Sequence, residues 1–193
     1  MQYNVIDAEA FFEATAPLDM TGTHAMRAFL ARLPAEARVL DAGCGSGRDA
    51  AAFAARGHTV LAFDAHPELV RMAGERMGVA AMRLTFQDVA FDRQFDGVWA
   101  CASLLHLPPA ELDDAVWRLA RALVPGGVLA MTFKHGSGTR HDARGRFFND
   151  QTRSSLAALV DRTDLLDLIE THADADLIGR DRAWVSALAR RRT

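Results

Sequence analysis

Apolar residues recur along this chain at two spacings, one typical of helices and the other of buried strands. A helix that stops near Pro34 is predicted by residues three and four positions apart, namely Met26, Phe29, Leu30 and Leu33. The run 37–43 is short, apolar and closed by glycine, which is the form of a strand buried inside a parallel sheet. This part of the chain therefore predicts a helix followed by a strand.

The alternation continues for most of the chain. Further strands are expected at 58–64, 81–88, 95–103, 128–134, 165–172 and 183–190. The helices between them are expected at 48–56, from Pro67 onward, around 112–123 and at 151–161, with a closing turn at Pro125-Gly126-Gly127. Strands that alternate with helices predict an α/β fold with a mostly parallel sheet and helices on both faces.

A polar, basic and glycine-rich segment, residues 135–150, interrupts this pattern and is expected to form a long loop or arm. Arg140, Arg144 and Arg146 concentrate positive charge there, next to Lys134. Because arginine side chains pair well with carboxylates and oxyanions, the segment is interpreted as a mobile arm beside a substrate that is anionic or polar. A solvated loop with incidental charge is the alternative.

A glycine-rich turn, residues 39–49 (VLDAGCGSGRD), joins the first strand to the next helix. Glycine lets a ligand approach the backbone, and in open α/β sheets ligands bind at this edge, beside a helix N-terminus that attracts anionic groups. A dinucleotide fingerprint that begins at Gly43 needs glycine at the position of Arg48, so a nicotinamide site is disfavoured. Asp41, two residues before Gly43, suits a ligand with an ammonium group, such as S-adenosylmethionine. A turn that is merely tight is the alternative.

Two acidic residues end the next two strands of the predicted sheet. Asp64 can accept hydrogen bonds from both hydroxyls of a ribose, although it could also cap the helix that starts at Pro67 after His66. Asp88 could accept a hydrogen bond from an adenine amino group, or it could be an ordinary turn aspartate. Because the glycine turn and both acids fall at the same edge of the sheet, together they favour a cofactor that contains a nucleoside.

These motifs resemble those of the class I S-adenosylmethionine-dependent methyltransferases over roughly residues 22–190. VLDAGCGSG is similar to their first motif, AFDAHPELV to the second, QDV to the third, FDGVWACASLLHL to the fourth, and VPGGVLAMTFK to the segment that closes the core. The resemblance implies a Rossmann-like sheet of seven strands in the order 3-2-1-4-5-7-6, with the last strand antiparallel. GCGSGRDAAAF, WACASLLHL and GRFF resemble short bacterial small-molecule methyltransferases that include tellurite-resistance-like proteins.

The expected cofactor site combines the glycine turn, the strand-end acids and the end of the fourth strand. It is formed by Asp41, Gly43, Cys44, Gly45, Gly47, Arg48, Asp64, Ala65, Asp88, Val89, Cys101 and Ser103. The resemblance implies S-adenosylmethionine as the cofactor and a small molecule as the methyl acceptor. Cys101 is expected to be a small buried residue rather than a nucleophile. The run GCGSG, with Cys44 in its second place, does not match the G-x-S-x-G of a hydrolase nucleophile elbow, which is therefore excluded.

Methyl transfer from a sulfonium is an in-line displacement on an activated carbon, so the main requirement is to position the acceptor. A general base is needed only where the acceptor must lose a proton. His106, three residues beyond Ser103, is expected to face the substrate and to act as that base or as a positioning group. The neighbouring Leu104, Leu105 and Leu107 leave a buried core histidine as the alternative.

Composition narrows the possible ligands, cellular location and metal content of the protein. The chain has 193 residues, of which 50% are hydrophobic, and its net charge of -3 argues against a nucleic-acid coat or a membrane-surface binder. Two isolated cysteines, an N-terminus without signal-peptide features and the lack of a long apolar run favour a cytoplasmic protein. The histidines and cysteines show no metal-ligand spacing, so no metal is expected.

One methyltransferase domain is expected over residues 1–193, with a helical cap or lid at 1–34, a cofactor-binding core at 35–134, the polar arm at 135–150, and a C-terminal helix with the last strands at 151–193. Tyr3, Phe11 and Phe12 are candidates for the aromatic residues of the lid. Two alternative functions stay open at this point. One is an NAD(P)-dependent oxidoreductase on a similar fold, and the other is a regulator that binds S-adenosylmethionine without catalysis.

Overall fold

A seven-stranded sheet forms the centre of the computed structural model, which describes residues 6–175 and 183–193. In spatial order its strands are β3 (Ala81–Arg83), β2 (Thr59–Asp64), β1 (Arg38–Ala42), β4 (Phe95–Cys101), β5 (Leu123–Lys134), β9 (Trp184–Arg191) and β8 (Leu166–Asp174). The first five pair in parallel, whereas β9 pairs antiparallel with β5 and with β8. The predicted Rossmann-like sheet is confirmed, and its last two strands are numbered 9 and 8 because a separate hairpin precedes them in the chain.

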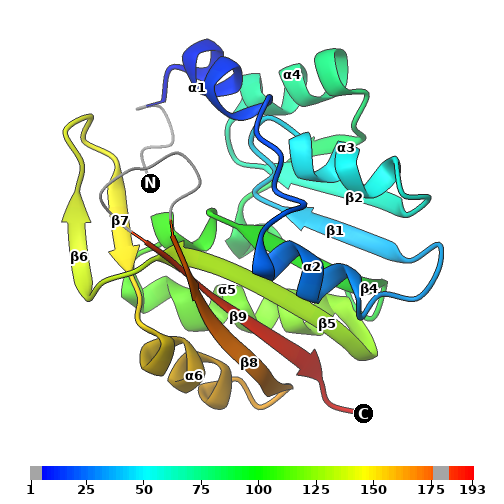
Figure 1. Ribbon diagram of the computed structural model, residues 1–193, viewed down its shortest axis with the longest axis vertical. Coiled ribbons are helices and arrows are strands. Elements are labelled where there is room, and N and C mark those ends of the chain that lie inside the picture. The colour runs from blue at the N-terminus through cyan, green and yellow to red at the C-terminus, as the bar shows by residue number, and fades with distance from the viewer. Residues whose placement is uncertain (1–5, 176–182) are drawn as a thin grey trace.

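Helices cover both faces of this sheet. α2 (His24–Leu30), α3 (Arg48–Ala54) and α4 (Pro67–Met77) pack on one face, and α5 (Pro109–Ala122) and α6 (Arg153–Arg162) pack on the other. Figure 1 shows α2 in front of the sheet and α5 behind it. The longest helix, α5, has 14 residues, and no helix within the described ranges is long and apolar enough to cross a membrane.

The strands bury different side chains on their two faces, because successive residues of a strand point to opposite sides. On the α2 face, Phe29, Phe53 and Trp99 form an aromatic cluster with ring centroids 5.2–5.9 Å apart. Full burial of one such side chain contributes about 1.5–3 kcal/mol. Gly97 makes room for the cluster, since a Cβ there would lie 2.6 Å from Phe29 Cζ. This packing fixes the sheet, and the loops at its carboxyl edge build the site.

Two strand boundaries differ from the predicted ones by five residues each. The third strand ends at Arg83, and the expected continuation to residue 88 is instead a 3-10 turn at Phe86–Asp88. Phe86 in this turn is buried, as a residue of an inner strand would be. Its apolar character therefore could not distinguish the turn from a longer strand. β5 starts at Leu123 rather than at 128, and the predicted Pro125-Gly126-Gly127 turn is an irregularity within it where the register against β4 shifts.

Residues 135–150 are not the predicted loop. They contain an antiparallel hairpin of β6 (Gly138–His141) and β7 (Phe147–Asp150), which forms its own two-stranded sheet at the left of Figure 1. The apolar pattern missed the hairpin because β6 is mostly exposed and carries no alternating apolar residues. Charge and stacking hold it instead, since Arg140 pairs with Asp150 and lies over the Phe148 ring. Whether the hairpin is mobile stays a prediction.

The N-terminal helix α1 (Ala8–Thr15) lies against α4 at the top of Figure 1. Arg76 of α4 pairs with Glu9 at 2.8 Å and with Glu13 at 3.3 Å. The same guanidinium lies 4.9 Å from the centroid of the Phe12 ring, which is buried beneath it. One arginine therefore anchors α1 by charge and by stacking.

The aromatic residues considered for the lid have different positions. Phe12 packs under Arg76, and Phe11 lies against the glycine turn, where a Cβ on Gly45 would come 3.0 Å from its ring. Tyr3 lies outside the described residues. α1 thus covers the glycine turn, as a cap would, and its opening as a lid stays a prediction.

Candidate active site

A cavity of about 960 Å³ opens at the carboxyl edge of the sheet. Its walls combine the ends of β1, β2, β4, β5 and β9 with the segment around α1 and with the β6–β7 hairpin. Small-molecule sites commonly measure about 300–1,000 Å³, so this cavity lies at the upper end of that range. It lies where ligands bind in open α/β sheets, and it brings together most of the predicted site residues.

Asp41, at the end of β1, lines this cavity with 2% of its surface exposed. Its Oδ2 atom is buried and has no hydrogen-bond partner among the residues that the structure describes. Burial, and next the negative charge of Asp49, raise the pKa of this carboxyl well above its ordinary value. A buried carboxyl oxygen without a partner is costly, and a cationic ligand group would satisfy it best.

Asp64 ends the adjacent strand β2. Its Oδ2 accepts a hydrogen bond from the Gly45 N–H at 2.9 Å, and its Oδ1 accepts one from the His66 N–H at 2.8 Å. Burial raises the pKa of Asp64, although these two backbone hydrogen bonds act in the opposite direction. Each carboxylate oxygen can accept a further hydrogen bond, so the side chain can bind two hydroxyl groups while it holds the glycine turn.

The glycine turn needs glycine for packing. The Gly43 N–H donates to the Phe63 carbonyl oxygen of β2 at 2.9 Å. Gly43 and Gly47 have φ values of 79° and 81°, which glycine adopts without strain. A Cβ on Gly43 would lie 2.4 Å from that of Ser103, and one on Gly47 would lie 2.9 Å from that of Ala73. Gly43 thus leaves space for the loop after β4, and Gly47 lets α3 pack closely against α4.

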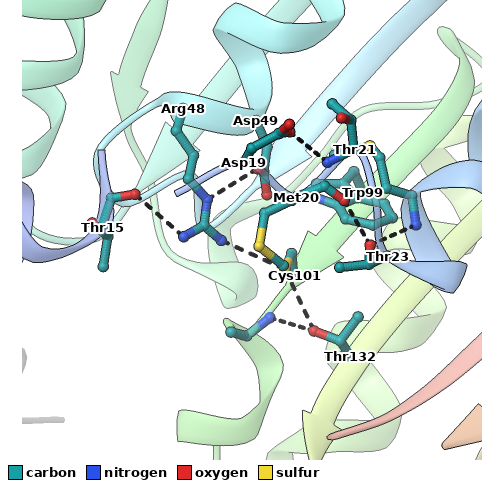
Figure 2. Close-up of polar contacts among 12 residues, drawn as sticks. Thr15, Asp19, Met20, Thr21, Thr23, Arg48, Asp49, Trp99, Cys101 and Thr132 are labelled. Atoms are coloured by element: carbon teal, nitrogen blue, oxygen red, sulfur yellow. Dashed lines mark hydrogen bonds and ion pairs between the residues drawn. The ribbon is translucent and has the colours of Figure 1, made fainter. Parts of the chain in front are cut away.

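Arg48, the first residue of α3, is anchored on several sides, as Figure 2 shows. Its guanidinium donates to Asp49 Oδ1 at 3.0 Å and reaches the Thr15 carbonyl oxygen at 3.5 Å and Cys101 Sγ at 4.0 Å. Asp49 in turn accepts a hydrogen bond from Trp99 Nε1 at 2.9 Å. The guanidinium is therefore held in a fixed orientation on the cavity wall, where it can donate to an anionic group.

The end of β4 carries Cys101, Ala102 and Ser103 into the cavity wall. Thr132 Oγ1 donates to Cys101 Sγ at 3.5 Å and accepts a hydrogen bond from the Ala102 N–H at 2.9 Å. Burial raises the pKa of Cys101 to about 12, so the thiol stays protonated and is not a nucleophile at neutral pH. Ser103 Oγ donates to a carbonyl oxygen of β1 at 2.7 Å. The φ of 54° at Ala102 turns the chain sharply toward His106.

His106 ends the 3-10 turn that follows β4, and it lines the cavity while the flanking leucines fill the core. Its Nδ1 lies 2.8 Å from the Phe147 carbonyl oxygen, and its ring meets the Phe148 ring at 4.9 Å. Because a carbonyl oxygen only accepts, Nδ1 carries the proton and Nε2 is the basic nitrogen. Burial lowers the pKa of His106, and the charge of Arg146 acts in the same direction, so the ring is mostly neutral at pH 7.

The hairpin brings two of the three predicted arginines to the cavity, and both are already paired. Arg140 forms a bidentate ion pair with Asp150 at 2.7 and 3.2 Å, and Arg146 donates to Asp142 at 2.7 Å. Both guanidinium groups also lie over the Phe148 ring, 4.4 and 5.3 Å from its centroid. Their charge is thus partly neutralised, and the positive field in the cavity is weaker than the sequence predicted.

The glycine turn and the first four strands match a family of known enzymes. The methyltransferase domain family matches this chain over residues 39–127. The magnesium-protoporphyrin O-methyltransferase of Rhodobacter capsulatus is 30% identical over 171 residues, which cover 83% of this chain and 74% of that protein. The chain belongs to the S-adenosylmethionine-dependent methyltransferases. Methyltransferase GfsG of Streptomyces halstedii is 29% identical over 84% of this chain, and the chain spans 62% of its length.

A solved methyltransferase structure shares the fold. The 1,6-didemethyltoxoflavin-N1-methyltransferase of Burkholderia thailandensis, with bound 1,6-didemethyltoxoflavin and S-adenosylhomocysteine, has a TM-score of 0.73 and 25% identity. The likeness covers 90% of this methyltransferase and 80% of that chain. S-adenosylmethionine is therefore the cofactor of the family and of this chain. The unpartnered oxygen of Asp41, the carboxylate of Asp64 and the guanidinium of Arg48 fit its ammonium, ribose and carboxylate groups.

Most of the predicted cofactor residues of this methyltransferase line the cavity, namely Asp41, Gly43, Cys44, Gly45, Arg48, Asp64, Ala65, Cys101 and Ser103. Gly47, Asp88, Val89 and Arg144 lie outside the cavity walls of the described structure. Asp88 accepts a hydrogen bond from Thr85 Oγ1 at 2.5 Å, as a turn aspartate does, and Val89 is buried in the core. A contact of Asp88 with adenine stays a prediction that the cavity does not support.

Several residues that line the cavity of the methyltransferase were not predicted from the sequence. His66 follows Asp64, and its Nδ1 is buried without a hydrogen-bond partner in the part of the chain that the structure describes. Phe86, Phe148 and Trp184 reach the cavity from a 3-10 turn, the hairpin and β9. His66 had a signal, because it comes directly after a strand-end acid. Phe86 and Phe148 lie in segments already considered, the strand predicted at 81–88 and the GRFF run, whereas Trp184 had no signal because β9 is distant in the chain.

Proposed function

We propose that this methyltransferase transfers the methyl group of S-adenosylmethionine to a small polar acceptor held beside His106 and the β6–β7 hairpin. One observation carries the proposal. A single cavity joins Asp41, whose buried Oδ2 has no partner in the described structure, to His106, whose basic nitrogen is Nε2. The first group suits a cofactor with an ammonium, and the second suits an acceptor that must lose a proton.

The cofactor half of the proposal rests on three charged side chains. S-adenosylmethionine supplies an electrophilic methyl group on a positively charged sulfur. Asp41 accepts hydrogen bonds from the ammonium, Arg48 donates to the carboxylate, and Asp64 accepts from the ribose hydroxyls. Since Asp64 also binds the Gly45 N–H, the turn that approaches the cofactor and the carboxylate that holds it act as one unit. The protonated thiol of Cys101 does not compete as a nucleophile.

The acceptor half depends on positioning and on one proton transfer. Holding two reacting groups in line can lower a barrier by about 7–11 kcal/mol, and a general base adds roughly 10²–10⁴-fold in rate. His106 takes the acceptor's proton on Nε2 while the Phe147 carbonyl oxygen holds Nδ1. With an acceptor that is already an anion, His106 acts only by positioning. The same site can therefore serve oxygen, nitrogen or sulfur acceptors of different acidity.

The walls of the acceptor half favour a polar molecule with a flat apolar part. Phe148 and Trp184 contribute aromatic rings, and Lys134 Nζ lies 4.0 Å from the centroid of the Trp184 ring. An anionic acceptor remains part of the proposal because three cations, Lys134, Arg140 and Arg146, line this region. The ion pairs of the two arginines reduce that preference. We therefore expect polarity to matter more than negative charge.

Binding and turnover measured together test the proposal. Calorimetry with S-adenosylhomocysteine should show specific binding, and mass spectrometry should detect a product one methyl group heavier from a panel of phenols, thiols and nitrogen heteroaromatics. Matched pairs that carry either a carboxylate or an amide separate anionic from neutral preference. Arg146→Ala should weaken turnover of the carboxylate member more than that of the amide member.

Other outcomes would favour the alternative functions. Binding of S-adenosylhomocysteine with no product from any acceptor in the panel would favour a regulator without catalysis. Tight binding of NAD(P) with none of S-adenosylhomocysteine would favour an oxidoreductase. We place the activity in the cytoplasm, because Cys44 and Cys101 are both free thiols, which is usual in a reducing compartment. The net charge of -3 supports small molecules rather than nucleic acid as substrates.

A further inference from the structure

The β6–β7 hairpin makes a direct contact with the histidine at the centre of the proposed reaction. His106 Nδ1 and the Phe147 carbonyl oxygen are 2.8 Å apart, although 41 residues separate them in the chain. This distance is that of a good hydrogen bond. A neutral histidine can carry its proton on either nitrogen, and only the form with an unprotonated Nε2 can take a proton there. The position of one carbonyl oxygen therefore selects the reactive form of the ring.

A single carboxylate builds the turn that comes before this carbonyl. Asp142 Oδ1 accepts hydrogen bonds from the Arg144 N–H and the Arg146 N–H at 2.9 Å each, and Oδ2 accepts one from the Arg146 guanidinium at 2.7 Å. The Asp142 N–H donates back to the Arg146 carbonyl oxygen at 3.0 Å. Partial burial opposes ionisation, but the hydrogen bonds from Arg146 hold the pKa of Asp142 below its ordinary value. The charged carboxylate thus closes the loop directly before Phe147.

The ring of His106 is confined on a second side by Phe148. The two ring centroids are 4.9 Å apart in a T-shaped arrangement. Phe148 is itself covered by the Arg140 guanidinium at 4.4 Å, and Arg140 is fixed by its bidentate pair with the buried Asp150. Rotation of the imidazole is therefore restricted by its edge-to-face contact with Phe148, and its hydrogen-bond direction is set by the main chain of the hairpin.

We propose that Asp142 is a positioning residue for His106: by closing the hairpin turn, it places the Phe147 carbonyl oxygen so that His106 keeps its proton on Nδ1 and presents Nε2 to the acceptor. Asp142 acts on the reaction through the main chain, at a distance from the acceptor's reacting atom. The effect on catalysis rests on the proposed function, whereas the position of the proton is a property of the protein itself. The positioning role of Asp142 and the catalytic role of His106 can therefore be disproved separately.

Nitrogen-15 NMR of the histidine side chains in the full-length protein tests this inference, because the shifts of the two ring nitrogens report which one carries the proton. His106→Gln identifies the signals of His106 by their loss. In the unaltered protein we expect Nδ1 protonated and Nε2 bare. Asp142→Ala removes the oxygen that accepts hydrogen bonds from the Arg144 and Arg146 N–H groups. The Phe147 carbonyl oxygen then loses its fixed position, so the Nδ1 proton of His106 should move in part to Nε2. Asp142→Asn keeps an oxygen at this place and should retain the original form.

Asp114→Ala is the matched control. It removes another Asp–Arg pair with the same spacing of four residues, in which Arg118 Nε donates to Asp114 at 2.7 Å on α5, and Asp114 does not line the cavity of the described structure. This variant should leave the His106 signals unchanged. Unchanged affinity of Asp142→Ala for S-adenosylhomocysteine would confirm that the cofactor half is intact.

The outcomes separate the two proposals. A shift of the proton in Asp142→Ala with a fall in kcat of about tenfold or more, restored in Asp142→Asn, supports both. The same shift with unchanged kcat supports the positioning role and overturns His106 as the base. A bare Nδ1 in the unaltered protein, or no shift in Asp142→Ala, overturns the inference about Asp142 whatever the activity.

Discussion

The carboxylate of Asp64 accepts a hydrogen bond from the Gly45 N–H at 2.9 Å, so the end of β2 holds the turn that follows β1. Asp64 and Gly45 both line the cavity. A residue that is proposed to bind the cofactor's ribose therefore also sets the shape of the loop that approaches the cofactor. Two effects of its replacement have to be distinguished, the loss of a ligand contact and the loosening of the turn.

Asp64→Ala should weaken the binding of S-adenosylhomocysteine about tenfold or more, because hydrogen bonds to a charged group contribute about 1.5–3 kcal/mol. Calorimetry measures the change. The Asp64→Asn side chain can still accept a hydrogen bond from one N–H of the turn but loses the negative charge. Its affinity for S-adenosylhomocysteine should therefore lie between that of the unaltered protein and that of Asp64→Ala. An affinity unchanged by Asp64→Ala in a folded protein would remove the assignment of Asp64 to the ribose.

Cofactor affinity should depend on pH through Asp41. The pKa of this carboxyl is raised in the free protein by burial and by Asp49, whereas the cofactor's ammonium requires the carboxylate. Binding should therefore release a proton, and affinity should fall as pH decreases through the raised pKa. Calorimetry of S-adenosylhomocysteine from about pH 5 to about pH 9 measures this dependence. Asp41→Asn should bind weakly at every pH, and a pH dependence that survives in this variant would contradict the assignment.

Replacing His106 should affect turnover and not cofactor binding. His106→Ala should lower kcat at least about tenfold, the low end of what general-base catalysis contributes, with little change in affinity for S-adenosylhomocysteine. Since the pKa of His106 is lowered by burial, the neutral base is present at pH 7, and kcat should fall only as pH decreases below the ordinary histidine value of about 6.5. In His106→Ala, kcat should not show this fall at low pH. An equal loss of turnover and cofactor affinity would indicate a structural role instead.

The anchor between α1 and α4 should control the release of the cofactor. Arg76→Ala removes the ion pairs with Glu9 and Glu13, so S-adenosylhomocysteine should dissociate faster, as stopped-flow fluorescence can measure. High salt should have the same effect on the unaltered protein, because exposed pairs are screened. Arg71→Ala is the matched control, since Arg71 pairs with glutamates of its own helix. Equal dissociation rates for the two variants would argue against a lid.

Activity should not depend on a metal ion. No group of three or more His, Cys, Asp or Glu side chains within residues 6–175 and 183–193 is arranged to hold one. Dialysis against a chelator should leave turnover unchanged, because the proposed reaction uses only positioning and a base. Loss of activity that one divalent ion restores would contradict this expectation.

Local signals predicted the cofactor half of the molecule well. β1, the glycine turn and β2 follow each other in the chain, so that apolar runs and turn residues revealed both the strands and the acids at their ends. The same reasoning went wrong at 81–88, because the buried Phe86 of a 3-10 turn has the apolar character of a strand residue. Within that turn Asp88 accepts a hydrogen bond from Thr85 Oγ1, and its contact with adenine stays a prediction.

The acceptor half could not be predicted in the same way. β6 has no apolar alternation, and its pairing with β7 depends on ion pairs such as Arg140–Asp150, whose partners cannot be read from spacing alone. The arginines were predicted to face an anionic or polar acceptor, and the structure shows two of them paired with aspartates. Trp184 reaches the cavity only because β9 lies beside β5, a neighbour distant in the chain.

The separation of the hairpin from the seven-stranded sheet has an evolutionary consequence. β6 and β7 pair only with each other in the described sheets, so insertions or substitutions there leave the register of every strand that carries Asp41, Asp64 or Cys101 unchanged. If the hairpin determines the acceptor, as proposed, acceptor choice can diverge under selection while cofactor use is inherited intact. For protein engineering, exchanging this hairpin with that of a relative is therefore a direct way to seek a methyltransferase with a new acceptor.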